Sequence, residues 1–538
     1  MTLSRISRHL QRWKTDRVIR GQLTRVESYL RSFENGCNKK ERPVIFFNAS
    51  TRISHLSMNA AFSLLASWAV RSAGVPVLHV VCKSGLRQCM LGTKVNDLTN
   101  PPPCEKCIRY SHLLFPTEHI VPLSFDQRVS SEYESELKDK SLEELSVWEE
   151  HSLPLGELCT PTLGWALRRY NLLDDYPTRH ILYQYLLSAV NLVRVFEELF
   201  DRENPRALVV FNGITYPEAI ARRVALRKGI PVVTHEVGLG SFSAFFSHDH
   251  ATFRQIDLPP DFQLGEQDDD QLDAYLESRA QGRFTMAGIK FWPQIQNLPQ
   301  DLLDRMCQYN QTVVIFTNVI FDTSQVHANT LYEDMFSWLE DVLKVIKKYK
   351  DTLFVIRAHP DEDRPGKASR ESVSDWVKRT NATSYQNVHF FSPSQYVSSY
   401  KLIDLAKFVM VYNSSIGLEA SIMGVPVLCA GRARYTQLPT VFFPSDRNEY
   451  LDKLINFLTT KKVDLPEEFI KNARKFLYYE LFKASLDFGG FLNPWPALPG
   501  FVTFSRFNAQ QVTCQVSSEM KILAEGILRG EPLVYPIR

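Results

Sequence analysis

The length of 538 residues exceeds that of one domain, which usually has ~100–200 residues, so we expect at least two domains. Apolar residues make up 44% of the chain and charged residues 23%, as in ordinary soluble globular proteins. The formal net charge of +2 gives no reason to expect a nucleic-acid partner, and the lack of a long apolar run predicts no transmembrane helix.

Residues 1–42 are predicted to hold a basic amphipathic helix. Eight Lys or Arg residues lie in the first 31 positions, against only Asp16 and Glu27. The apolar side chains fall on one helical face: Ile6, Leu10, Trp13, Ile19, Leu23, Val26 and Leu30. We expect this helix to pack on the body of the protein. The alternative is a peripheral contact with the inner face of an anionic membrane.

The expected location is the cytoplasm. The N-terminus has no apolar signal core, and nine cysteines in such a chain fit a reducing compartment.

Residues 43–300 predict a first, Rossmann-like domain that would bind the acceptor. Short apolar runs alternate with amphipathic segments, which is typical of βαβ units and a parallel sheet. The predicted strands are 43–50, 75–82, 207–213 and 230–238, and the predicted helices are 56–73 and 216–228. A helical insertion is expected at about 125–204.

The domain is predicted to end in a linker, residues 255–300, with one short helix. Its acidic run "EQDDDQ" could suggest an Asp-x-Asp metal site. Because it does not follow a buried strand, we interpret it as a solvated loop.

Residues 301–465 repeat the βαβ pattern and predict a second Rossmann-like domain, which would bind a nucleotide-sugar. The predicted strands are 311–318, 352–360, 408–415 and 425–431, and the predicted helices are 331–350 and 416–423. The tail, 466–538, is expected to be helical and irregular and to pack back on the body. The whole chain therefore predicts an α/β fold of two domains with parallel sheets facing a central cleft.

Ligands of such sheets bind beyond the carboxyl ends of the strands. One strand of the second domain ends in Asn413, Ser414 and Ser415 and turns directly into a helix. Hydroxyls that cap the helix, beside the N–H groups of its first turn, would make a phosphate site. Gly417 would allow close approach of the ligand, and Glu419 would reach a ribose or base. The alternative is a capping box that starts at Ser415.

His359 and Pro360 end the preceding predicted strand in the sequence "RAHPDED". An imidazole there can donate to a phosphate oxygen, and the proline fixes the direction in which the chain leaves the strand. The two strand ends together predict one donor site.

"VIRAHPDED" and, about fifty residues later, "VYNSSIGLEASIMGVPVLCAG" carry a family resemblance. They resemble the carboxyl-terminal half of bacterial capsule polysaccharide biosynthesis proteins, which are GT-B glycosyltransferases. The His-Pro and Ser-Ser pairs are also similar to those of bacterial GT-B sialyltransferases, where they hold the phosphate of a CMP-sugar. CDP-glycerol polyol-phosphate transferases are similar more loosely.

The resemblance covers about 310–435 and implies a GT-B-like fold. It implies donor-binding roles for His359, Ser414, Ser415 and Glu419. The acidic-acidic-Gly motif of the sialyltransferases has no clear match, since "HEVGLG" offers only Glu236 before a glycine. The base and the sugar therefore stay open.

The catalytic carboxylate is expected in the first domain. His235 and Glu236 follow a predicted strand and precede a Gly-rich turn, so both would lie at the cleft and assist attack by an acceptor hydroxyl. The alternative is a polar turn with a satisfied histidine. Asp322 could reach across from the second domain. Other polar residues at strand ends could shape the same cleft: Asn48, Ser50 and Asn212.

Four cysteines predict a possible structural zinc site: Cys82, Cys89, Cys104 and Cys107. The last pair has the C-x2-C spacing of a zinc knuckle, whereas the first pair is more widely spaced. The alternatives are reduced thiols or disulfides.

The predicted function is transfer of a sugar from a nucleotide-sugar donor, with a CMP-linked sugar as a candidate, to a surface or capsular polysaccharide. No cofactor is expected in catalysis, and the acceptor would be a glycan or a lipid-linked glycan. The alternatives are a CDP-polyol phosphotransferase and a non-catalytic GT-B-fold protein of glycan assembly.

Overall fold

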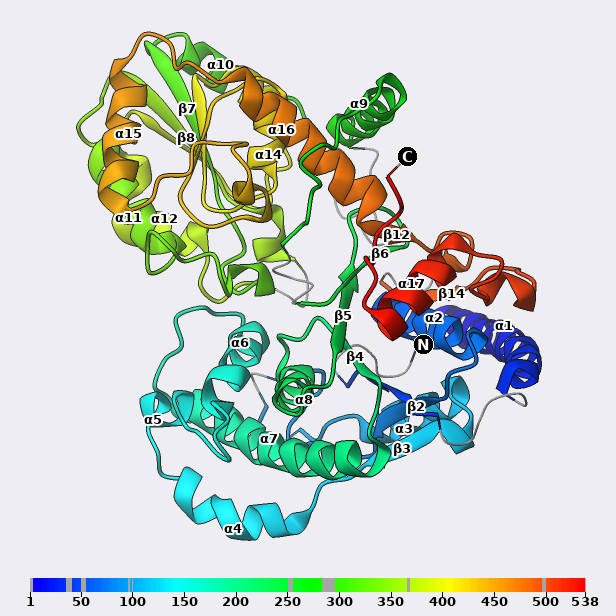
Figure 1. Cartoon of the computed structure of the whole chain (residues 1–538). Helices are drawn as coiled ribbons and strands as arrows, with labels where there is room; N and C mark the ends of the chain where they lie inside the picture. The colour runs from blue at the N-terminus through cyan, green and yellow to red at the C-terminus, as the bar shows by residue number, and fades with distance from the viewer. Residues whose placement is uncertain are drawn as a thin grey trace.

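The computed structural model describes residues 3–34, 41–49, 55–94, 97–98, 100–249, 255–282, 296–364 and 368–537. Two α/β domains lie side by side, and the chain crosses between them (Figure 1). Each domain has a largely or wholly parallel sheet with helices on both faces. The predicted fold class, two Rossmann-type domains, is therefore confirmed.

The first domain contains a seven-stranded sheet in the order β12-β6-β5-β4-β1-β2-β3. Its strands are β1 (Val44–Phe47), β2 (Val77–Cys82), β3 (Ile120–Leu123), β4 (Ala207–Phe211), β5 (Val232–Val237), β6 (Ser243–Ser247) and β12 (Ser485–Asp487). The first five run parallel, whereas β6 and β12 add an antiparallel edge. The sequence predicted four of these strands but not β3, β6 or β12.

Helices cover both faces of this sheet. Those that belong to the first domain by sequence are α1 (Leu3–Glu34), α2 (Met58–Ser72), α3 (Cys104–Leu114), α4 (Gln127–Leu137), α5 (Leu142–Ser146), α6 (Leu155–Leu167), α7 (Tyr176–Glu203) and α8 (Tyr216–Arg227). Alternate residues of a strand point to opposite faces. In β1, Val44 and Phe46 therefore pack toward α1 and α2, whereas Ile45 and Phe47 pack toward α7 and α8.

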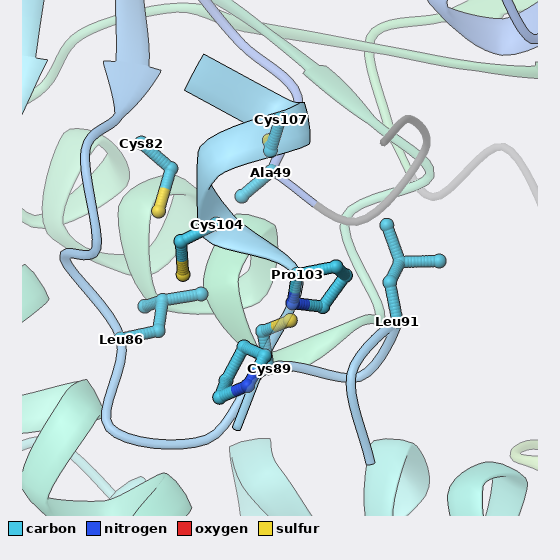
Figure 2. Close-up of a pocket in the computed structure, with 9 residues that line it drawn as sticks. Ala49, Cys82, Leu86, Cys89, Leu91, Pro103, Cys104 and Cys107 are labelled. Atoms are coloured by element: carbon cyan, nitrogen blue, oxygen red, sulfur yellow. The ribbon is translucent and has the colours of Figure 1, made fainter. Parts of the chain in front are cut away.

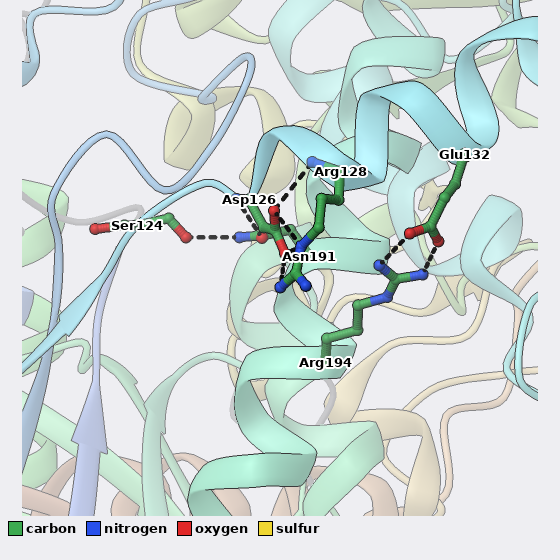
Figure 3. Close-up of polar contacts among 6 residues, drawn as sticks. All are labelled: Ser124, Asp126, Arg128, Glu132, Asn191 and Arg194. Atoms are coloured by element: carbon green, nitrogen blue, oxygen red, sulfur yellow. Dashed lines mark hydrogen bonds and ion pairs between the residues drawn. The ribbon is translucent and has the colours of Figure 1, made fainter.

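The predicted helical insertion is α4 to α7, and polar contacts tie it to the sheet (Figure 3). Asn191 of α7 donates to the carbonyl of Ser124, just after β3, at 3.1 Å and accepts from the backbone N–H of Asp126 at 2.9 Å. Arg194 pairs with Glu132 of α4. These contacts fix α7 to the end of β3 and to α4.

The C-terminal half of α1 packs on the body of the protein, as expected. Ile19, Leu23, Val26 and Leu30 are buried in the first-domain core. Arg71 of α2 pairs with Glu27 of α1, with an N–O distance of 2.6 Å. Among the described helices, none combines the length and apolar character that crossing a membrane would require.

The second domain contains a five-stranded parallel sheet in the order β11-β10-β7-β8-β9. Its strands are β7 (Gln311–Phe316), β8 (Thr352–Arg357), β9 (Val388–Phe391), β10 (Phe408–Val411) and β11 (Val427–Cys429). Its helices are α10 (Gln300–Met306), α11 (Met335–Ile346), α12 (Val373–Thr380), α13 (Ser399–Asp404), α14 (Ile416–Ile422), α15 (Arg447–Thr459) and α16 (Glu467–Tyr478). The sequence missed β9.

The segment predicted as a linker with one short helix holds the 15-residue helix α9 (Glu266–Ala280). The acidic run begins this helix and docks on α16: Arg474 pairs with Asp269 and with Asp273, each at 2.7 Å. Tyr478 donates to Asp268. The interpretation of the acidic run as a solvated loop was wrong, since a helix start favours acidic side chains.

The tail returns to the first domain. β12 pairs with β6, and β13 (Leu492–Pro494) and β14 (Val502–Phe504) form a separate hairpin. α17 (Ser518–Arg529) packs against α2 (Figure 1). Leu486, Phe488 and Leu523 are buried in the same core as β1 and α2.

Candidate functional site

A cleft of about 570 Å³ lies between the two domains. The first domain contributes the end of β5 and the turn after it, α9 contributes two side chains, and the second domain contributes its strand ends. The predicted site residues that line it are Glu236, Asp322, His359, Asn413, Ser414, Ser415 and Glu419. The structure therefore brings these seven residues together in one cleft.

Glu236 is the carboxylate of the first-domain wall. Its oxygens accept from the side-chain amides of Asn59 and Asn212, each at 3.2 Å, and from the N–H of Val237 at 2.9 Å. Burial raises the pKa of Glu236 to about 7, although these three donors lower it. A carboxylate with a pKa near 7 is suited to accept a proton at neutral pH.

His235 does not line the cleft, so its prediction as a catalytic residue was wrong. It precedes Glu236 in β5 and therefore points to the opposite side of the strand. Its side chain is fully buried, and its Nε2 lies 3.3 Å from Asn48 Oδ1. Burial lowers the pKa of His235 to about 3, so the ring is neutral. Ser50, also predicted at the cleft, lies outside the described residues.

Asp322 lies in the loop that follows β7 and is exposed to the cleft. Its Oδ1 accepts from the backbone N–H of Ser324 at 2.9 Å. The negative charge of Asp322 raises the pKa of both Glu236 and His359, which belong to different domains. The charge of Asp322 therefore acts on one residue in each wall of the cleft.

His359 follows β8 and presents a ring nitrogen to the cleft. Its Nδ1 accepts from the backbone N–H of Asp361 at 3.1 Å, which leaves the ring proton of the neutral form on Nε2. Burial lowers the pKa of His359, and the carboxylates of Asp361 and Asp322 oppose that shift. Pro360 does not line the cleft; it begins the short turn that fixes the ring.

The Asn413-Ser414-Ser415 turn follows β10. Asn413 accepts from Gln325 at 2.9 Å, which joins this turn to the loop after β7. Ser415 occupies the N-cap position of α14, but its side chain makes no capping hydrogen bond. Neither predicted capping arrangement is therefore present, and the exposed Ser415 hydroxyl faces the cleft.

Gly417 is buried beneath the turn instead of touching a ligand, so its predicted contact was wrong. A Cβ at this position would lie 2.7 Å from the hydroxyl oxygen of Tyr435. That hydroxyl donates to the carbonyl of Ser414 at 2.7 Å. The glycine thus makes room for the bond that fixes the serine turn.

Glu419 lines the cleft but is only 4% exposed and has protein partners. It accepts from Arg279 Nε of α9 at 2.9 Å and from the hydroxyl of Tyr400. Burial lowers the pKa of Arg279, but the carboxylate of Glu419 and the phenols of Tyr275 and Tyr400 raise it by more, so the net shift of this pKa is upward. Glu419 therefore holds α9 at the cleft. Its carboxylate oxygens are used by these two protein donors, in place of the predicted contact with a ribose or base.

Sequence reasoning missed the cations of this cleft. Arg432 and Arg434 follow β11 and line it together with Arg279. Arg434 pairs with Glu480 at 3.1 Å and stacks on the ring of Phe245, 5.4 Å from its centre. Guanidinium groups match the geometry of phosphate oxygens. The strand-end rule that identified the serines could have identified these arginines too.

The two α/β domains, one with a largely parallel and one with a wholly parallel sheet, and the cleft between them define a GT-B-like fold. Residues 293–438, about a quarter of the chain, match the family model "Capsule polysaccharide biosynthesis protein". This segment contains His359 and the serine turn. The resemblance to capsule polysaccharide biosynthesis proteins is confirmed over these residues.

Solved structures show more distant likenesses. Thermosulfurimonas dismutans KpsC, beta Kdo 2,4 transferase, is 12% identical over 56% of this chain and 85% of that chain, with a TM-score of 0.36. The beta Kdo 2,7 transferase of the same protein is 16% identical over 62% and 89%, with a TM-score of 0.32.

Methanocaldococcus jannaschii UDP-GlcNAc 2-epimerase, in complex with UDP-GlcNAc and UDP, is 11% identical over 81% of this chain and 98% of that chain, with a TM-score of 0.28. No curated protein matches the chain.

Proposed function

We propose that the protein is a glycosyltransferase that moves a sugar from a nucleotide-sugar to a surface or capsular polysaccharide, without a metal ion in catalysis. The observation that carries the proposal is the pairing of Glu236 and His359 in one cleft, from opposite domains and both near Asp322. The family match of residues 293–438 supports the substrate class.

The second-domain wall would bind the phosphate of the donor. The Nε2–H of His359 and the hydroxyl of Ser415 are hydrogen-bond donors at this wall. Arg432 and Arg434 add positive charge. Such groups stabilise the negative charge that develops on the leaving phosphate. A CMP-linked sugar is the donor that the His-Pro and Ser-Ser resemblance favours.

The first-domain wall would activate the acceptor. In a direct displacement, Glu236 takes the proton of the acceptor hydroxyl, and the acceptor oxygen forms a bond to the anomeric carbon. The bond from that carbon to the phosphate oxygen breaks, and its electron pair leaves with the nucleotide. The pKa near 7 keeps a large fraction of Glu236 ionised at neutral pH.

A ligand and turnover screen tests this proposal. Thermal shift with CMP, CDP, UDP and GDP should identify one nucleotide that stabilises the protein, by ~2.7 kcal/mol at a hundred times its dissociation constant. The sugar forms of that nucleotide are then assayed for nucleotide release with a glycan or lipid-linked acceptor.

Three results would contradict the proposal in different ways. Release of CMP from a CDP-polyol would indicate a phosphotransferase. Binding without release from any donor would indicate a non-catalytic assembly protein. Loss of turnover on treatment with a metal chelator, restored by magnesium or manganese, which thiolate sites do not prefer, would disprove metal independence.

We also propose that the N-terminal part of α1 makes a peripheral contact with an anionic membrane. Trp13 is 57% exposed and Val18 is 49% exposed, beside the exposed Arg12, Lys14 and Arg17. Basic side chains add ~1 kcal/mol each near an anionic surface. The protein should sediment with phosphatidylserine vesicles at low salt, and Trp13→Ala should weaken this. Equal binding to neutral vesicles would contradict the electrostatic contact.

A further inference from the structure

A second cavity, in the first domain, is lined by four cysteines (Figure 2). Cys82 is the last residue of β2, and Cys89 lies in the loop that follows. Cys104 and Cys107 lie in the first turn of α3. The remaining lining residues are apolar: Ala49, Leu86, Leu91, Pro102 and Pro103. Three segments thus bring their thiols to one apolar cavity.

The loop between Cys82 and Cys89 is held firmly by α7 and α8. Asn191 donates to the carbonyl of Gly85 at 3.2 Å, and the Arg87 N–H donates to Ser188 Oγ at 2.9 Å. Tyr216 donates to the carbonyl of Gln88. These buried anchors fix the backbone positions of the first two cysteines.

The chain also packs tightly between Cys89 and Cys104. A Cβ at Gly92 would lie 2.7 Å from the Cα of Pro102, so only glycine allows these backbones to approach so closely. This contact brings the loop after Cys89 against the start of α3. The widely spaced first pair of cysteines is therefore near the C-x2-C pair.

Backbone hydrogen bonds close the turn after Cys89. The N–H groups of Gly92 and Thr93 donate to the Cys89 carbonyl at 3.0 and 2.9 Å. Cys104 and Cys107 lie at the N-terminus of α3, where the helix dipole favours negative charge.

None of the described cysteines forms a disulfide. The other residues that line the cavity are apolar, so a bound cation would be the group that stabilises four thiolates there together.

We propose that Cys82, Cys89, Cys104 and Cys107 bind one structural zinc ion. Four thiolates complete a tetrahedral zinc site and leave no position open for catalysis, and soft thiolate ligands exclude magnesium and calcium. The described residues include no group already at metal-binding spacing, so the side chains must turn toward a common centre. Zinc binding would release the thiol protons and cross-link β2, the loop that follows β2, and α3.

This inference is independent of the proposed transferase activity. The first test is elemental analysis of the full chain, purified without chelator from cells grown with both zinc and iron. About one zinc per chain is expected. Less than about a tenth of an equivalent, with four reactive thiols, would overturn the proposal. Iron with acid-labile sulfide would overturn it in favour of a cluster.

Variants assign the ligands. Cys104→Ser with Cys107→Ser should lose the zinc, whereas a control with Cys307→Ser and Cys514→Ser, which lie outside the cavity, should keep it. Retention of zinc in the first variant would overturn the assignment. If that variant does not fold, cobalt exchanged into the unmutated protein gives a second readout. Tetrahedral thiolate coordination predicts strong sulfur-to-cobalt charge-transfer absorption, and its absence would also overturn the proposal.

Discussion

The two walls of the central cleft differ in their chemistry. The first-domain wall presents one carboxylate, Glu236, held by two side-chain amides and raised in pKa by burial. The second-domain wall presents carboxylates as well, Asp322 and Glu419, but adds donors and cations: His359, the Ser415 hydroxyl and two arginines. In the reaction proposed above, this difference divides proton removal and phosphate binding between the domains, so each can be changed by mutation without the other.

The largest expected effect follows from Glu236→Gln. This change keeps the shape of the side chain and removes the proton acceptor, so turnover should fall ~10²–10⁴-fold, as for other lost general bases. Nucleotide affinity should barely change, because donor contacts lie on the other wall. Steady-state kinetics and calorimetric titration of the nucleotide measure the two quantities.

A matched control for this variant is Glu218→Gln. Glu218 is a fully buried carboxylate of the same domain, bonded to Thr215 and absent from the cleft lining. It should leave turnover within a few-fold. If Glu236→Gln behaves like this control, Glu236 is not the base, and Asp322 becomes the candidate.

His359→Ala should have an intermediate effect, on nucleotide binding. Loss of one hydrogen bond to a charged group costs ~1.5–3 kcal/mol, which weakens affinity at least about tenfold. Ser414→Ala together with Ser415→Ala tests the turn in the same way. His389→Ala is the control, since His389 is partly buried in the same domain but does not line the cleft. Unchanged affinity in both cleft variants would refute the phosphate site.

The smallest expected effect is a shift in the pH dependence of turnover, and it tests the role of Glu236 in the first-domain wall. Turnover should fall as the pH drops below about 7, because protonated Glu236 cannot accept the acceptor proton. Asn59 donates to this carboxylate and favours its charged form. Asn59→Ala should therefore raise the pKa and move the acid limb of the pH profile upward by about one unit.

Ser57→Ala is the control for that shift. Ser57 caps α2, the helix that carries Asn59, but does not contact Glu236. The control should lower stability by ~1 kcal/mol and leave the acid limb in place. An acid limb that does not move in Asn59→Ala would show that another group controls it.

Local patterns in the sequence predicted the strands and therefore the edge on which the site lies. They could not predict which side chain of a strand faces the cleft, because that depends on how the sheet packs. His235 and Glu236 are neighbours in β5, yet one is buried behind the sheet and the other faces the cleft.

Contacts distant in the sequence were also beyond prediction. Arg279 reaches Glu419 across 140 positions, and nothing near either residue indicates the pair. The start of α14 was also not predictable, because the same Ser-Ser sequence fits a helix start with or without a side-chain capping hydrogen bond. The structure has none at Ser415. Arg432 and Arg434, by contrast, follow a predicted strand and were overlooked.

The pairing of β12 with β6 has a consequence for biosynthesis. Ser485 of β12 pairs with Phe245 of β6, which is made 240 residues earlier, and the whole second-domain sheet is encoded between them. Until β12 has been made, β6 is an open sheet edge, and the hydrophobic core around Phe62 lacks Phe488 and Leu523. The first domain therefore closes only after the second-domain sheet has been made, and that sheet can fold while the edge of β6 is still open.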